Sequence, residues 1–424
     1  MHLTPQIIKI YKPIKLSYLQ NKRGEMKFRS ISKFNLRNKT VLVRTDYNVP
    51  VSKGKIADNE KIKSSLETIN ILLNRNCKII ILTHLGRPNG KVVQKLKLNA
   101  VFKELKNLLP KEKITKLDDC IGKEIKSTIE KGKNKQIFLL ENVRFYKEER
   151  NNHPAFAHSL ANLADVYIND AFSVSHRKHA SLEAITHFLP SFAGFALEKE
   201  MFHLNKALNA SKPRVWILGG AKLDKTDFML QALKKADKVL IGGALGFPFL
   251  KAKGYRVGQS KIDSASVINA KKILKKWSSK KMVLPVDFLV TDRLSPMAKV
   301  KERDYNQIGT HEIALDIGPK TIELFEKHLS KAKTVVWNGP LGYSEWVNFA
   351  RGTKEIGRFL GKVKAFKLVG GGETSEAVHK FHLSHNFTYV SPSGGATIMY
   401  LSGKELPAIK ALERNYKQKK RFKL

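Results

Sequence analysis

Short runs of apolar residues alternate with stretches of helical periodicity in the first half of the chain. The strand-like runs are Thr40–Arg44, Lys78–Thr83, Gln136–Leu140 and Asp165–Ile168, and helical spacing is clear at Lys61–Leu73 and Ala155–Leu163. Such an alternation predicts parallel strands connected by crossover helices.

The same alternation resumes after Pro213. Strand-like runs follow at Arg214–Leu218, Lys238–Ile241, Met282–Leu284, Thr334–Trp337, Ala365–Val369 and Phe387–Val390. Between the two sets, Leu197–Ala210 has helical spacing and contains no glycine. We therefore predict an α/β protein of two doubly wound parallel-sheet (Rossmann-like) domains joined by a hinge helix.

The expected domain organisation follows from these runs. It comprises a basic N-terminal extension (1–25), a first domain (26–196), the hinge helix (197–210), a second domain (211–405) and a C-terminal segment with a basic tail (406–424). The extension carries one acid, Glu25, lacks the apolar block of a secretory signal, and contains Pro5 and Pro13, which break long helices. We expect it to be dispensable.

The chain is strongly basic, with a net charge of +41. Such a charge is compatible with nucleic acid, an anionic membrane or an anionic small substrate. Because the lysines are spread along the whole chain, we favour a solvated surface, and any nucleic-acid binding should be non-specific. No apolar run approaches the roughly 20 residues that span a bilayer. The two cysteines show no metal-binding spacing and fit a cytoplasmic protein.

Charged side chains follow the strands of the first half. Asp46 and Asn48 follow the first run, His84 and Arg87 the second, Arg144 the third and Arg177 the fourth. The carboxyl ends of parallel strands meet at one edge of a sheet, so these residues should converge there. Guanidinium groups suit a small phosphorylated carboxylate.

Glycine-rich turns follow the strands of the second half. They are Gly219-Gly220, Gly242-Gly243, Asn338-Gly339-Pro340, Gly370-Gly371-Gly372 and Gly394-Gly395. Glycine lets backbone N–H groups approach phosphate oxygens, and a helix N-terminus adds a positive dipole. Lys222 and Lys225 lie beside the first turn, and we expect Thr374 and Ser375 to cap the helix that follows Gly372.

Several common nucleotide and hydrolase motifs are missing from the sequence. It contains no GxxxxGK[ST] P-loop, no GxGxxG and no GxSxG. The residues alone predict an anion pocket on one domain facing a nucleotide site on the other. That arrangement suits phosphoryl transfer, in which positioning and charge neutralisation do most of the catalysis.

The motifs resemble those of phosphoglycerate kinase from about Met26 to Arg414. They are VLVRTDYNVP (41–50), THLGRPNG (83–90), LLENVRFYKEE (139–149), NDAFSVSHRKHAS (169–181), ILGGAKLDK (217–225), VVWNGPLGYSE (335–345) and LVGGGETSEA (368–377), in the order of the family. The resemblance implies reversible phosphoryl transfer between 1,3-bisphosphoglycerate with ADP and 3-phosphoglycerate with ATP, in glycolysis and gluconeogenesis. It also implies Mg²⁺ with the nucleotide, and we expect a monomer.

The resemblance implies a role for each matching residue. The phosphoglycerate ligands would be Asp46, Asn48, Lys61, His84, Arg87, Arg144 and Arg177. The Mg-nucleotide ligands would be Gly219, Lys222, Lys225, Asn338, Glu345, Gly370, Gly371, Gly372, Glu373 and Thr374, with Glu373 as the metal-linked carboxylate. The residues at the moving phosphoryl group would be Lys61, Lys225, Gly371, Gly394 and Gly395.

Several features depart from the family's pattern, and one of them is a GGAK loop (219–222) that is one residue short. Lys61 stands in place of an Arg, Glu373 in place of an Asp, Ser173 in place of a Gly, Ser344 in place of a Phe, and Ser391-Pro392-Ser393-Gly394-Gly395 in place of a Ser-Thr-Gly-Gly-Gly run. Lys keeps the charge of Arg but loses its bidentate fork. Two alternatives therefore stay open: a kinase-like protein with weakened catalysis, and a basic nucleic-acid-binding protein on this scaffold.

Overall fold

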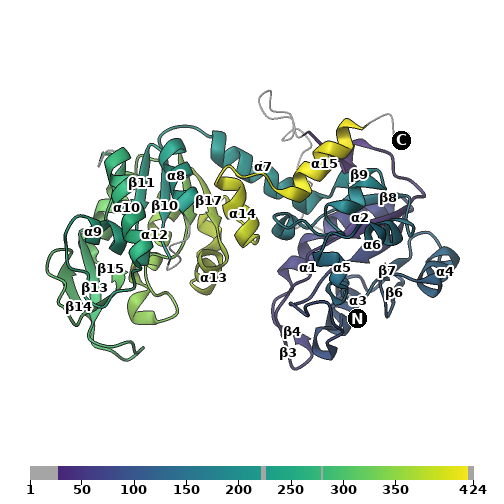
Figure 1. The fold of residues 1–424 in the computed structure, drawn as a ribbon, viewed down its shortest axis with the longest axis horizontal. Helices are drawn as coiled ribbons and strands as arrows, with labels where there is room; N and C mark the ends of the chain where they lie inside the picture. The colour runs from purple at the N-terminus through teal and green to yellow at the C-terminus, as the bar shows by residue number, and fades with distance from the viewer. Residues whose placement is uncertain (1–26, 221–225, 278–279, 419–424) are drawn as a thin grey trace, which may run out of the picture.

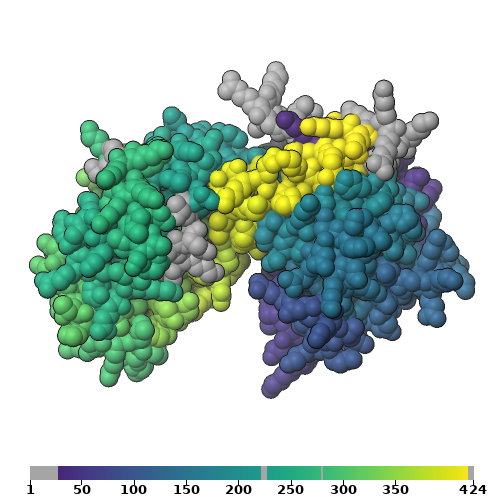
Figure 2. Space-filling model, viewed as in Figure 1, coloured from purple at the N-terminus to yellow at the C-terminus, as the bar shows by residue number. Residues whose placement is uncertain are grey.

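A computed structural model of the chain describes residues 27–220, 226–277 and 280–418. Two lobes lie side by side and are joined by helix α7 (Phe195–Asn209) (Figure 1). The space-filling view shows the molecule deeply hollowed between the two lobes (Figure 2). Within the described ranges, no helix has both the length and the apolar character needed to cross a membrane.

The first lobe is built on a seven-stranded sheet in which every paired strand is parallel. Its order is β1-β9-β8-β2-β5-β7-β6. The strands are β1 (Arg29–Ser30), β2 (Thr40–Arg44), β5 (Lys78–Leu82), β6 (Ile114–Lys116), β7 (Ile137–Leu139), β8 (Val166–Asn169) and β9 (Ser191–Ala193). The central strands are almost wholly buried because helices cover both faces, which explains their unbroken apolar runs.

Short helices and one hairpin complete the first lobe. They are α1 (Glu60–Ser64), α2 (Leu66–Asn74), α3 (Asn99–Leu108), α4 (Lys123–Lys131), α5 (Lys147–Arg150), α6 (Pro154–Ala161), the 3₁₀ turn η6 (Phe172–Val174) and the hairpin of β3 (Val51–Ser52) and β4 (Lys55–Ile56). Helix α2 buries Ile69, Leu72 and Leu73, whose spacing places them on one face.

The second lobe contains a six-stranded parallel sheet and a separate antiparallel sheet. The parallel sheet has the order β12-β11-β10-β16-β17-β18, and the antiparallel sheet has the order β14-β13-β15. The strands are β10 (Arg214–Leu218), β11 (Lys238–Ile241), β12 (Met282–Val283), β13 (Asp287–Thr291), β14 (Lys301–Asp304), β15 (Ile313–Ile317), β16 (Thr334–Asn338), β17 (Phe366–Gly370) and β18 (Tyr389–Val390).

Helices follow most strands of the second lobe. They are α8 (Thr226–Lys235), α9 (Phe247–Ala252), α10 (Ser264–Lys276), α11 (Pro319–Leu329), α12 (Arg351–Lys362), α13 (Gly372–Lys380) and α14 (Gly394–Leu401). The last helix of the chain, α15 (Pro407–Lys417), instead returns to the first lobe (Figure 1). There the buried Asn415 side chain accepts hydrogen bonds from Arg29 and from the Ser191 N–H, and donates to the carbonyls of Thr186 and Leu189.

The two parallel sheets confirm the predicted fold class. The antiparallel sheet β14-β13-β15 was not predicted. Its three strands follow one another in the chain with no helix between them, so they do not show the alternation of strands and helices on which the prediction rested. The predicted helix Lys61–Leu73 is two helices, α1 and α2, which meet at Ser65. The Ser65 hydroxyl donates to the Ile62 carbonyl. Serine side chains commonly compete in this way with the backbone hydrogen bonds of a helix.

Candidate active site

Asp46 is the centre of a polar cluster at the carboxyl edge of the first sheet. Its Oδ2 accepts from Lys61 Nζ at 2.8 Å and from the Ser173 hydroxyl. Its Oδ1 accepts from the Asn48 backbone N–H at 3.0 Å and lies 3.6 Å from His84 Nδ1. Burial alone would raise the pKa of Asp46, but the facing His84 and Lys61 outweigh burial and hold that pKa below its usual value. Asp46 is therefore a carboxylate at neutral pH.

His84 is buried between this carboxylate and a buried arginine. Arg44 Nη2 lies 3.4 Å from His84 Nδ1, and Arg44 Nε donates to the Ser181 hydroxyl at 2.8 Å. Burial lowers the pKa of His84 well below its ordinary value, Asp46 opposes the shift, and Arg44 reinforces it. We therefore assign His84 as a neutral imidazole at pH 7, available for hydrogen bonding rather than for charge.

The arginines predicted to converge are close enough to influence one another. Burial, with the charges of Arg44 and Arg177, lowers the pKa of Arg144 to about 10. Burial, followed by the charge of Arg87, lowers the pKa of Arg177. Arg144 Nη1 donates to the Gly86 carbonyl at 2.8 Å. Arginine side chains carry a positive charge at neutral pH, so this edge of the sheet is strongly cationic.

Donors remain available in this cationic cluster. The buried Nε atoms of Arg144 and Arg177 have no hydrogen-bond partner among the residues that the structure describes. Arg87 is exposed, and Asn48 uses its side-chain oxygen to accept from the Gly86 N–H at 2.8 Å. Buried N–H groups without partners are costly, so an anion that accepts from them would be stabilised here.

Glycines bring three loops of the second lobe into direct contact. The Gly219 N–H donates to the Asn338 carbonyl at 2.8 Å, and the Asn338 side chain donates to the Gly370 carbonyl at 2.7 Å. A Cβ on Gly219 would lie 2.2 Å from the Pro340 carbonyl oxygen, and one on Gly371 would lie 2.5 Å from Asn338 Nδ2. Gly371 also has a φ of +97°, which favours glycine.

Two helices begin at this junction. Helix α13 starts at Gly372, where an added Cβ would meet nothing within 4 Å, and α14 starts at Gly394, whose Cβ position is 3.7 Å from the Gly372 backbone nitrogen. The amino ends of α13 and α14 therefore point backbone N–H groups toward the same region. Two helix N-termini that share an open space form a favourable site for a phosphate group.

The expectation that Thr374 and Ser375 cap α13 is wrong. Gly371 is the N-cap residue, and no side chain caps the helix. Thr374 lies in the first turn, and its hydroxyl accepts from the Gly339 N–H at 2.6 Å, so it joins two loops instead. Gly371 has a backbone conformation that favours glycine, and it therefore takes the N-cap position. Thr374 consequently lies within the first turn of α13 rather than before it.

The two predicted carboxylates of the nucleotide site lie on different segments, Glu373 in the first turn of α13 and Glu345 in a loop. Glu373 Oε2 is 3.4 Å from the Cβ position of Gly220, so this side chain reaches the first glycine turn. Glu345 is exposed in the loop after β16, and its carbonyl accepts from Lys380 Nζ at 3.1 Å. Lys222 and Lys225 lie outside the described residues. Among those described, no group of three or more His, Cys, Asp or Glu side chains could hold a metal ion.

The lobes touch close to this junction. The Cβ position of Gly395, at the start of α14, is 3.7 Å from the ring of His176 in the first lobe. The Glu200 carboxylate of α7 accepts from the hydroxyls of Ser391 and Ser393, at 3.1 Å and 2.5 Å. The connecting helix is therefore hydrogen-bonded to the turn that precedes α14.

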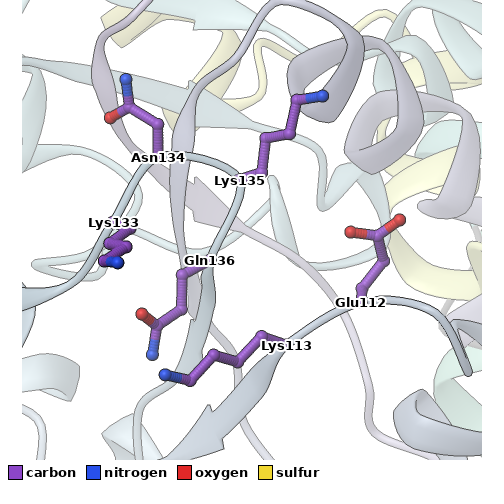
Figure 3. A pocket seen from close by; sticks show the side chains of 6 residues that line it. All are labelled: Glu112, Lys113, Lys133, Asn134, Lys135 and Gln136. Carbon is purple, nitrogen blue, oxygen red and sulfur yellow. The ribbon is translucent and has the colours of Figure 1, made fainter.

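A separate shallow hollow of about 270 Å³ lies on the first lobe, lined by Glu112, Lys113, Lys133, Asn134, Lys135 and Gln136 (Figure 3). These residues precede β6 and β7, so the hollow lies at the amino ends of the strands. Ligands of open parallel sheets bind at the opposite, carboxyl edge. The polar cluster and the glycine loops therefore form the candidate active site.

Sequence reasoning missed two buried residues that support the site. Arg44 ends β2 and was taken only as a strand residue, although a charge in an apolar central strand is itself a signal. Glu200 lies on α7, and its helical spacing gave no indication that it would bond to a distant turn.

Comparisons with known proteins agree with this geometry. The model of the family described as "Phosphoglycerate kinase" matches residues 31–404. A phosphoglycerate kinase of Moorella thermoacetica is 41% identical over 387 residues, covering 90% of this chain and 98% of the relative. A phosphoglycerate kinase of Trichodesmium erythraeum is 42% identical over 390 residues, covering 91% of this chain and 98% of the relative.

Solved structures give the same result. A phosphoglycerate kinase of Coxiella burnetii superposes with a TM-score of 0.82 at 36% identity, covering 91% of this chain and 99% of its own. A phosphoglycerate kinase of Pyrococcus horikoshii superposes with a TM-score of 0.77 at 29% identity, covering 92% of this chain and 100% of its own. With the family match extending over both lobes, the chain belongs to the phosphoglycerate kinase family and is a kinase of that kind.

Proposed function

We propose that the enzyme moves a phosphoryl group reversibly between 1,3-bisphosphoglycerate and ADP, with 3-phosphoglycerate and ATP as the products. The observation that carries the proposal is that the amino end of α14 approaches the first lobe. The Cβ position of Gly395 lies 3.7 Å from the ring of His176, and that of Gly394 lies 3.7 Å from the Gly372 nitrogen at the start of α13. Phosphoryl transfer depends mainly on positioning two anionic substrates and neutralising their charge.

The first lobe would hold the phosphoglycerate. The proposed ligands are Asp46, Asn48, Lys61, His84, Arg87, Arg144 and Arg177. The Asp46 carboxylate can accept a hydrogen bond from a hydroxyl of the substrate. The neutral imidazole of His84 can form a hydrogen bond with an uncharged oxygen of the substrate. The arginines offer guanidinium donors, which suit the phosphate and carboxylate groups. Lys61 is paired with Asp46 at 2.8 Å, and we assign it to the group in transfer.

The second lobe would hold the nucleotide with its Mg²⁺. The proposed ligands are Gly219, Lys222, Lys225, Asn338, Glu345, Gly370, Gly371, Gly372, Glu373 and Thr374. Glu373 would face the metal ion. A single protein carboxylate fits Mg²⁺ that arrives with a nucleotide, because phosphate oxygens and water supply its other ligands. Gly371, Gly394, Gly395 and Lys225 would contact the phosphoryl group as it moves.

Catalysis would require the lobes to approach one another about α7. Closure excludes water and brings the two substrates into line. The Glu200 contacts to Ser391 and Ser393 support α7 as the hinge, since they tie this helix to the turn before α14. We further propose that the enzyme acts as a monomer in the cytoplasm.

A coupled assay with 3-phosphoglycerate and Mg-ATP tests the proposed reaction. We expect ADP release that depends on 3-phosphoglycerate, and no turnover with glycerate, which lacks the phosphate for the arginine cluster. A reaction without 3-phosphoglycerate measures background ATP hydrolysis. Folded enzyme that fails to turn over at saturating substrates would contradict the proposal.

A further inference from the structure

Asp46 Oδ2 is shared by a charged and a neutral donor from different elements. Lys61, on α1, donates to it at 2.8 Å, and the hydroxyl of Ser173, on η6, donates to the same oxygen. The other oxygen, Oδ1, accepts from the Asn48 backbone N–H at 3.0 Å. Each carboxylate oxygen is therefore bonded even if Lys61 is absent.

The ion pair between Lys61 and Asp46 opposes the proposed role of Lys61, because Lys61 must leave Asp46 to reach the transferring phosphoryl group. The Asp46 side chain is 7% exposed, whereas that of Lys61 is 29% exposed. When Lys61 turns toward the transferring phosphoryl group, it leaves a buried carboxylate. A buried carboxylate that loses a donor is destabilised unless another donor remains. The Ser173 hydroxyl is that donor.

Ser173 is also close to the contact between the lobes. The turn η6 packs against α14. The ring of Phe172, next to Ser173, lies edge-on to the ring of Tyr400 on α14, with 6.5 Å between the ring centroids. The hydroxyl thus lies on a segment that touches both the Asp46 cluster and the helix whose amino end receives phosphate in our proposal. It is well placed to keep Asp46 oriented as the lobes move.

We propose that Ser173 is a positioning residue, which holds Asp46 in place when Lys61 exchanges Asp46 for the transferring phosphoryl group. This inference rests on the role of Lys61 proposed above. Ser173 does not touch the reacting atoms. It lowers the cost of releasing Lys61, so its effect falls on turnover, while the arginines that hold phosphoglycerate are unaffected.

The first experiment compares steady-state kinetics of three variants. We expect Ser173→Ala to lower kcat by about 10-fold, as for a lost hydrogen bond to a charged group, and to change the KM for 3-phosphoglycerate less than about two-fold. Ser173→Thr keeps the hydroxyl and should restore kcat. Ser175→Ala is the matched control, because the Ser175 hydroxyl donates only to the Ala171 carbonyl, at 3.1 Å, in the same segment. An unchanged kcat in Ser173→Ala, or an equal loss in Ser175→Ala, would overturn the inference.

The second experiment repeats Ser173→Ala in a Lys61→Ala background. If Ser173 acts by easing the release of Lys61, the double variant should turn over like Lys61→Ala alone. A further loss of about 10-fold in the double variant would assign Ser173 a general structural role and overturn the inference. Turnover of Lys61→Ala equal to that of the wild type would instead refute the role of Lys61, and the inference with it. Ser173→Gly also removes the hydroxyl and replaces the alanine variant if that variant folds poorly.

Discussion

Lys61 carries the largest functional question among single residues, because it stands where the resemblance to the family implies an arginine. Its ammonium group is paired with Asp46 at 2.8 Å. Lysine gives a point charge on a flexible stem, while arginine gives a planar fork with two parallel donors. The charge is retained, so Lys61 should support catalysis with weaker stabilisation of the equatorial phosphoryl oxygens.

We predict that Lys61→Ala lowers kcat on the order of 10²-fold or more, as for the loss of one transition-state donor. Lys61→Arg should raise kcat or leave it level. The KM for 3-phosphoglycerate should change less, because Arg87, Arg144 and Arg177 stay in place. Steady-state kinetics of both variants provide the measurement, and Lys63→Ala, on the exposed side of the same helix, is the control. Wild-type turnover in Lys61→Ala would assign the side chain to the surface.

Glu373 makes a second residue-scale prediction, on metal-nucleotide affinity. We expect Glu373→Gln to weaken Mg-ADP binding on the order of 10-fold, since the variant loses the carboxylate that lies at the Gly219–Gly220 turn. Titration calorimetry with Mg-ADP and with metal-free ADP separates the contribution of the metal ion to the affinity from that of the nucleotide. Glu376→Gln, the same change on the exposed face of α13, should bind like the wild type. Equal affinity for Mg-ADP in both variants would remove Glu373 from the metal site.

At the scale of secondary structure, the entry to α13 depends on a conformation that favours glycine. We predict that Gly371→Ala lowers stability by about 1–3 kcal/mol, because its φ is +97° and its Cβ would press on Asn338 Nδ2. Gly372→Ala is the matched control for stability, since its Cβ meets open space within a helix. Thermal unfolding of both variants tests this prediction, and equal melting temperatures would show that the loop adapts.

The elements that sequence reasoning found are those with a strong pattern. Strands β2 and β10 match their predicted bounds because both faces of each are covered, so nearly every residue is apolar. Strand β1 has two residues, too few for any period. The antiparallel strand β14 reads KERD, with two exposed and two half-buried residues, so it carries no apolar signal at all.

The candidate active site likewise divides into residues that the sequence predicts and residues that it does not. The residues directly after strands could be predicted, because topology brings the carboxyl ends of parallel strands together. The partners of those residues could not. Ser173 bonds to Asp46, and Thr374 to Gly339, across more than thirty positions of sequence, and such pairs depend on the packing of whole loops.

For the whole molecule, the hinge helix carries a buried carboxylate that makes stability depend on pH. Burial raises the pKa of Glu200 to about 7, although the hydroxyls of Ser393 and Ser391 oppose the shift. The unfolded chain has the ordinary value of about 4.3. Between these values the folded state binds a proton that the unfolded state has lost. The contribution of Glu200 to stability is thus complete below about pH 4 and falls as pH rises through 7.

We predict that Glu200→Gln, which stays neutral, gains in melting temperature relative to the wild type as pH rises from 5 to 8. Thermal unfolding at several pH values in that range supplies the comparison. Glu405→Gln removes an exposed carboxylate and should show a difference from the wild type that does not grow with pH. A pH-independent difference for Glu200→Gln would mean that this group titrates normally in the folded enzyme.

The return of α15 to the first lobe has a consequence for biosynthesis. Asn415 of α15 joins Arg29 of β1 to Ser191 and to the carbonyls of Thr186 and Leu189, all more than 200 positions before it in the sequence. A ribosome makes the chain from its N-terminus, and domains usually fold in that order as they emerge. Here the sheet that emerges first waits for α15, which is translated after the second lobe, so the edge at β1 and β9 stays uncovered until α15 has emerged. Chaperones that bind nascent chains should therefore dwell on this lobe longer than its early position suggests.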